Sequence, residues 1–75
     1  MQVVIYKSDT CGACRAIVPR LLALAKERGL KVKVVDAERC EADDKICKDL
    51  RYVPAIFVDG REIEIKQFVK ILGEG

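Results

Sequence analysis

Apolar side chains run together or alternate with polar ones in four short segments of the chain, and each predicts a strand. The continuous apolar run within residues 2–7 predicts a strand that is covered on both faces. Residues 30–36 alternate apolar side chains with lysines, which indicates an edge strand or a solvated rim. Residues 55–58 and 61–65 predict two more strands, joined by the turn-forming pair Asp59 and Gly60.

Three other segments have the spacing of helices. Apolar residues recur every three or four positions between residues 11 and 28, and Gly29 predicts the end of this helix. Residues 8–10 supply good N-cap candidates just before it. Residues 41–50 and 66–72 predict two further helices, of which the first has only a thin apolar stripe.

The order of these elements, βαβαββα, predicts an α/β fold in a single domain of residues 1–75. A full helix separates the first two strands, so we expect them to be parallel with a right-handed crossover. The last two strands are expected to form an antiparallel hairpin. The prediction is therefore a four-stranded mixed sheet with helices on both faces.

Composition narrows the possible functions. The 75 residues carry 14 Lys and Arg against 12 Asp and Glu, a net charge of +2, which implies no strong attraction to nucleic acid or membranes. Hydrophobic residues make up 51% of the chain, too many for a disordered protein. The sequence contains no histidine, which excludes a histidine base or a histidine metal ligand.

No segment is predicted to be a signal peptide or a membrane span, because only a strand's length of apolar residues precedes Lys7. We therefore expect a cytoplasmic protein. Thiols are usually kept reduced in that compartment, so paired cysteines indicate redox or metal chemistry before they indicate structural bridges.

Cys11 and Cys14 form a Cys-x-x-Cys motif where a strand ends and a helix begins. The first turn of a helix exposes unpaired N–H groups and the positive end of its dipole. A thiolate at Cys11 should be stabilised there, with a lowered pKa, while Cys14 lies within reach as a second thiol. Gly12 is expected to let the backbone turn tightly between them.

The motif has other readings. A Cys-x-x-Cys pair is also half of a zinc or iron–sulfur site, so a metal-binding module that uses Cys11 and Cys14 is the alternative function. A redox-inert adaptor that binds an extended strand through Val53 and Pro54 is a third. The predicted βαβ context favours the redox reading.

The whole chain resembles the thioredoxin superfamily, and its small glutaredoxin-like branch most closely. Residues 3–6 before the motif and residues 53–60 after it look like strands of glutaredoxins. Residues 14–19, with a basic residue after the second cysteine and then Pro19, look more like thioredoxin. The resemblance implies that the peptide bond before Pro54 is cis and that Pro54 faces the two cysteines.

The resemblance also implies the activity: reduction of protein disulfides, with Cys11 as the nucleophile and Cys14 as the resolving thiol. No cofactor or metal is expected. The backbone of Val53 can pair with an extended substrate, so the expected substrate-binding residues are Thr10, Gly12, Ala13, Val53 and Pro54. Expected partners are protein disulfides and an electron donor, either a disulfide reductase or a small thiol, and the protein is expected to be monomeric.

Cys40 and Cys47 form a second pair whose role the sequence leaves open. If both lay on one helix they would be about 10 Å apart along its axis, too far for a disulfide. A bridge becomes possible if Cys40 precedes the helix. Semi-buried free thiols, a stabilising disulfide and a regulatory or metal-binding role are the three readings.

Overall fold

Four strands form one mixed sheet in the computed structural model, which describes residues 1–73. The strand order is β2-β1-β3-β4, in which β1 is parallel to β2 and antiparallel to β3, and β3 and β4 form a hairpin. The predicted α/β class, strand directions and edge position of the lysine-bearing strand are confirmed. The elements are β1 (Val3–Lys7), α1 (Gly12–Glu27), β2 (Val32–Asp36), α2 (Lys45–Lys48), β3 (Ala55–Val58), β4 (Arg61–Ile63) and α3 (Ile65–Gly73).

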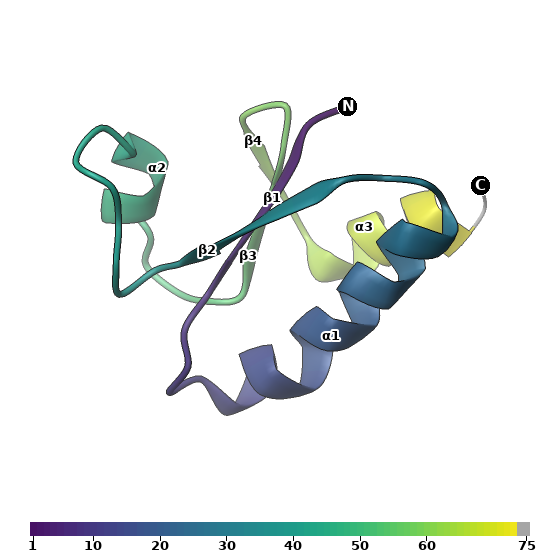
Figure 1. Cartoon of the computed structure of the whole chain (residues 1–75), viewed down its shortest axis with the longest axis horizontal. Helices are drawn as coiled ribbons and strands as arrows, with labels where there is room; N and C mark the ends of the chain where they lie inside the picture. The colour runs from purple at the N-terminus through teal and green to yellow at the C-terminus, as the bar shows by residue number, and fades with distance from the viewer. Residues whose placement is uncertain (74–75) are drawn as a thin grey trace.

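Helices cover the two faces of the sheet unequally. Figure 1 shows α1 and α3 together on one side and α2 alone on the other. The larger hydrophobic cluster lies under α1 and α3 and includes Ile5, Ile56 and Phe68, none of which is exposed. A smaller cluster lies under α2, around Tyr6 and Cys47. Strand β1 thus contributes to both clusters, which explains its continuous apolar run.

Some helices and strands begin or end at other residues than predicted. The end of α1 differs because the last turn of a helix needs hydrogen-bond partners of its own. Gly29 has a φ of 72° and closes α1, while the N–H of Leu30 bonds the carbonyl of Ala25 at 2.9 Å. Leu30 is therefore part of the helix end, and β2 begins only at Val32. At the other end of the chain, β4 stops at Ile63 and α3 begins at Ile65.

The second helix is much shorter than residues 41–50. Asp44 is its N-cap, and the carboxylate of Asp44 accepts a hydrogen bond from the N–H of Cys47 at 2.9 Å. The helix ends after Lys48, so it has little more than one turn. Its thin apolar stripe was the sign of this weakness, since a short helix depends on a good cap and on tertiary contacts.

Candidate active site

The side chain of Cys11 caps the start of α1. It is the N-cap of the helix, and its Sγ accepts a hydrogen bond from the backbone N–H of Cys14 at 3.1 Å. The sequence predicted an N-cap within residues 8–10, which is wrong because the hydroxyl groups there bind a carboxylate instead. The N–H groups of the first helical turn therefore point at a sulfur atom.

The two thiols, both free, have pKa values that move in opposite directions. The hydrogen bond from the Cys14 thiol is the largest cause that lowers the pKa of Cys11, followed by the backbone N–H groups of Cys14 and Ala13. Burial is the main cause that raises the pKa of Cys14, whose side chain is 2% exposed. Deprotonation thus falls first on the more accessible sulfur, as attack by a thiolate requires.

The segment before β3 faces this sulfur. The thiol of Cys11 donates toward the carbonyl oxygen of Val53, with 3.7 Å between sulfur and oxygen. The peptide bond between Val53 and Pro54 is cis, and both residues are half-buried. The fold therefore brings together two segments that are 42 residues apart in the sequence.

The remaining residues of the motif lie on the surface around Cys11. Thr10, Gly12 and Ala13 are all exposed. Gly12 does not have a positive φ, and a Cβ atom there would meet nothing within 4 Å, so the expected tight turn at Gly12 is wrong. Its lack of a side chain instead leaves open surface next to the sulfur of Cys11.

Glu38 is the site residue that sequence reasoning missed. Its carboxylate accepts hydrogen bonds from the hydroxyls of Ser8 and of Thr10, the latter at 2.9 Å. These bonds, that from Ser8 first, lower the pKa of Glu38. Parallel strands β1 and β2 end at the same edge of the sheet, so the residues that follow them are neighbours. The predicted parallel pair of strands was therefore the signal that could have identified Glu38. Through its two hydrogen bonds, Glu38 holds the turn that leads to Cys11.

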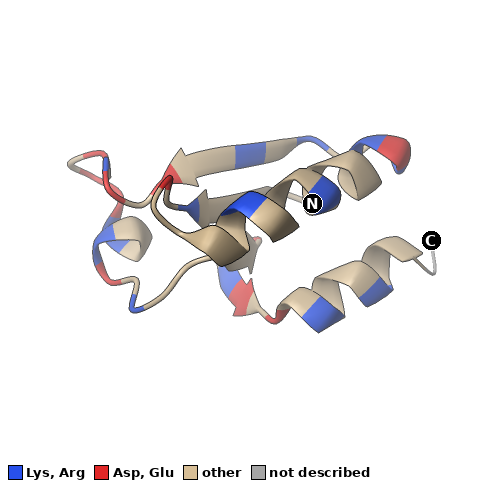
Figure 2. Ribbon diagram, turned by 90° about the horizontal axis from the view of Figure 1, so that it is seen from below, with Lys and Arg blue, Asp and Glu red and all other residues tan. Residues whose placement is uncertain are grey.

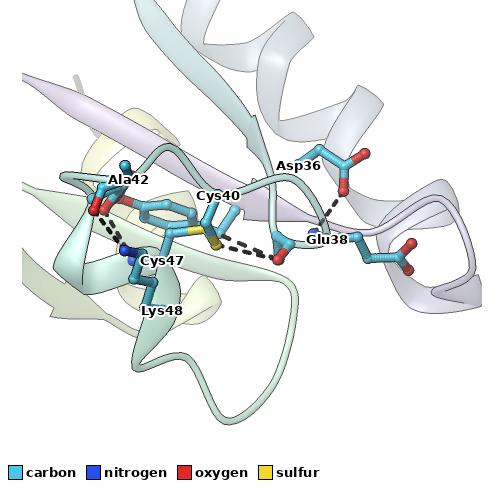
Figure 3. The surroundings of a disulfide bond; sticks show 9 residues. Asp36, Glu38, Cys40, Ala42, Cys47 and Lys48 are labelled. Carbon is cyan, nitrogen blue, oxygen red and sulfur yellow. Dashed lines mark hydrogen bonds between the residues drawn. A yellow bond between two sulfur atoms is a disulfide. The ribbon is translucent and has the colours of Figure 1, made fainter.

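Cys40 and Cys47 are joined in a disulfide, with their Cα atoms 5.7 Å apart (Figure 3). Of the three interpretations of this pair, the structure therefore supports the disulfide. The bond is possible because Cys40 lies in the loop before α2. The disulfide packs in the cluster under α2, on the opposite face from Cys14. Val53 packs against both clusters and so lies between the two sulfur pairs.

Within residues 1–73, no three side chains of Cys, His, Asp or Glu converge in a way that could hold a metal ion. The same part of the chain contains no helix with the length and hydropathy needed to cross a membrane.

Comparisons with known proteins agree with the architecture. No protein-family model matches the chain, and no curated protein matches it. Among solved structures, thioredoxin 1 from the thermophilic eubacterium Thermosipho africanus is similar, with a TM-score of 0.74, 19% sequence identity, and coverage of 99% of this chain and 92% of that one. Thioredoxin from Fasciola hepatica has a TM-score of 0.66 and 23% identity over 96% of this chain and 77% of its own. The chain therefore has the thioredoxin fold.

Proposed function

We propose that the protein is a thiol–disulfide oxidoreductase that reduces protein disulfides through Cys11 and Cys14. One observation carries the proposal: an accessible thiol with a lowered pKa accepts a hydrogen bond from the N–H of a buried second cysteine, at the first turn of a helix. The thioredoxin fold of the two solved structures supports it.

The reaction follows from the order in which the thiols ionise. The Cys11 thiolate attacks one sulfur of the substrate disulfide, which forms a mixed disulfide and releases the other substrate sulfur as a thiolate that takes up a proton. Cys14 then loses its proton and attacks the Cys11 sulfur. The substrate leaves fully reduced, and the two electrons it gained are those that Cys11 and Cys14 lost when their disulfide formed.

The proposal also covers the protein's location, its electron donor and its contacts with the substrate. A dithiol that acts as a reductant works in a reducing compartment, so we place the protein in the cytoplasm, as an electron carrier of the glutaredoxin or thioredoxin type. A disulfide reductase or a small thiol returns the Cys11–Cys14 pair to its reduced form. The proposed contacts for the substrate are Thr10, Gly12, Ala13, Val53 and Pro54. The protein acts as a monomer in this proposal.

Substitution of each cysteine tests the proposal. Cys11→Ser should abolish the reduction of a protein disulfide such as those of insulin, because the nucleophile is lost. Cys14→Ser should retain attack but accumulate a mixed disulfide, visible by mass spectrometry, because nothing resolves it. Ala23→Ser, on an exposed position further along α1, is the matched control. Undiminished activity of Cys11→Ser would contradict the proposal.

A further inference from the structure

A hollow of about 400 Å³ lies beside Pro54. Its wall consists of Tyr52 and Pro54 on one side and the end of β4 with the start of α3 on the other, which includes Ile63 and Ile65. Both isoleucines are half-buried and pack on the core under α1 and α3, as Cys11 does. The hollow therefore has an apolar base that is anchored in the same cluster as the dithiol.

The rim of this hollow is acidic. Glu62 and Glu64 line it, both are exposed, and no Lys or Arg is among the lining residues. Figure 2 shows acidic positions, in red, where β4 leads into α3. The hydroxyl of Tyr52 donates to the carboxylate of Glu62, which fixes the rim and still leaves acceptor positions free.

A second hollow, of about 390 Å³, borders Val53 and has the opposite character. It lies against α2 and the loop after β2, and its charged lining residues are Lys48, Arg51 and Glu38. Two hydroxyl groups bind one oxygen, Oε1, of Glu38, which keeps its negative charge, so this hollow has two basic side chains against one acidic one. Tyr52 lines both hollows, so the ridge of residues 52–54 separates an acidic side from a mainly basic one.

The ridge of residues 52–54 also borders the Cys11 sulfur. Val53 is the residue whose carbonyl oxygen lies 3.7 Å from the Cys11 sulfur, and Pro54 follows it directly. Pro54 is thus a wall of the acidic hollow and the direct neighbour of the residue whose carbonyl oxygen faces the Cys11 sulfur.

We propose that the hollow beside Pro54 selects disulfides in extended protein segments that carry Lys or Arg close to the reacting cysteine. The aliphatic stem of such a side chain packs on Pro54 and Ile63, and its cationic end lies between Glu62 and Glu64. Segments with an acidic residue at that position are disfavoured by repulsion from the same carboxylates. This inference rests on the proposed function and adds the substrate class.

Three peptides test it, each with one intramolecular disulfide and differing only in the residues next to the cysteines: Lys, Gln or Glu. We expect kcat/KM for the Lys peptide to exceed that for the Glu peptide by about three- to tenfold at low salt. The ratio should shrink as ionic strength rises, since the carboxylates are exposed. The Gln peptide reports the proposed function by itself, and failure of the protein to reduce it would contradict that function.

The variant Glu62→Gln with Glu64→Gln removes both charges and keeps the acceptor for Tyr52. It should bring the Lys-to-Glu ratio close to one. Glu27→Gln with Glu41→Gln changes the net charge equally at exposed positions outside the hollow, and it should keep the wild-type ratio. A wild-type protein that reduces all three peptides at one rate, or a preference lost equally in both double variants, overturns the inference and leaves the proposed function standing.

Discussion

Cys11 combines two roles at the scale of a single residue, because the atom that caps α1 is also the proposed nucleophile. Its pKa is lowered first by the Cys14 thiol and then by backbone N–H groups. In the proposed reaction, the side chain that resolves the mixed disulfide therefore also lowers the pKa of the attacking thiol.

A titration separates these causes. In wild-type protein, the thiolate absorbance of Cys11 should appear at a lower pH than that of an unperturbed cysteine, about 8.5. In Cys14→Ala the midpoint should move up toward that value, because the largest cause is removed, yet stay below it while the backbone N–H groups remain. Cys40 and Cys47 are disulfide-bonded and add no signal. An unchanged midpoint in Cys14→Ala would show that the backbone alone acts on the sulfur.

At the scale of single residues, the sequence identified the pair Cys11 and Cys14 but not the residue that holds the turn before them. Cys11 and Cys14 are predictable because they are three residues apart at a strand–helix junction. Glu38 was missed, since the parallel pairing of β1 and β2 brings it near the site but its two hydroxyl contacts exist only in the assembled fold. Short-range pattern carries no record of such a contact.

Among the elements, α2 is the one whose geometry depends most on a covalent bond. The helix has four residues, and the Cys40–Cys47 bridge ties its single turn to the preceding loop. A helix of this length is not stable on its own propensity. This dependence also explains why the predicted range of residues 41–50 was wrong, whereas the long periodic pattern of α1 was correct to within one residue at each end.

Removal of the bridge should therefore cost stability. We expect Cys40→Ser with Cys47→Ser to lower the free energy of unfolding by about 2–3 kcal/mol, the chain-entropy value for a loop of this size. Urea unfolding in a Cys11→Ser, Cys14→Ser background measures it without interference from the other pair. A reductant should reproduce the loss in that background and have no effect once the bridge is gone. Equal stability with and without the bridge would mean that the loop is held by its other contacts.

The whole molecule has little stability to spare. A chain of 75 residues has a free energy of unfolding of roughly 4–11 kcal/mol. Most of its interior lies in one cluster, where α1 and α3 meet the sheet. The sequence predicted the mixed sheet with helices on both faces, because element order and strand direction follow from connection lengths, but it did not place α3 beside α1. It did not predict that Val53 would belong to both clusters, which is a property of the assembled layers.

Phe68 tests how far the molecule depends on that cluster. It lies on α3 with 0% of its surface exposed, and Phe68→Ala should cost about 3–5 kcal/mol, a large part of the total. Val69→Ala on the same helix removes a side chain that is 40% exposed and should cost far less. Thermal unfolding followed by circular dichroism compares the two. Similar melting temperatures for both variants would contradict the assignment of the core.

The sulfur cap at the start of α1 links chemistry to local order. Every time Cys11 passes from thiolate to disulfide it loses its negative charge, and with it part of its strength as an acceptor for the Cys14 amide. In the proposed reaction, we therefore expect this capping hydrogen bond to weaken and strengthen once in each cycle. The amide hydrogen of Cys14 should then report the oxidation state of the pair.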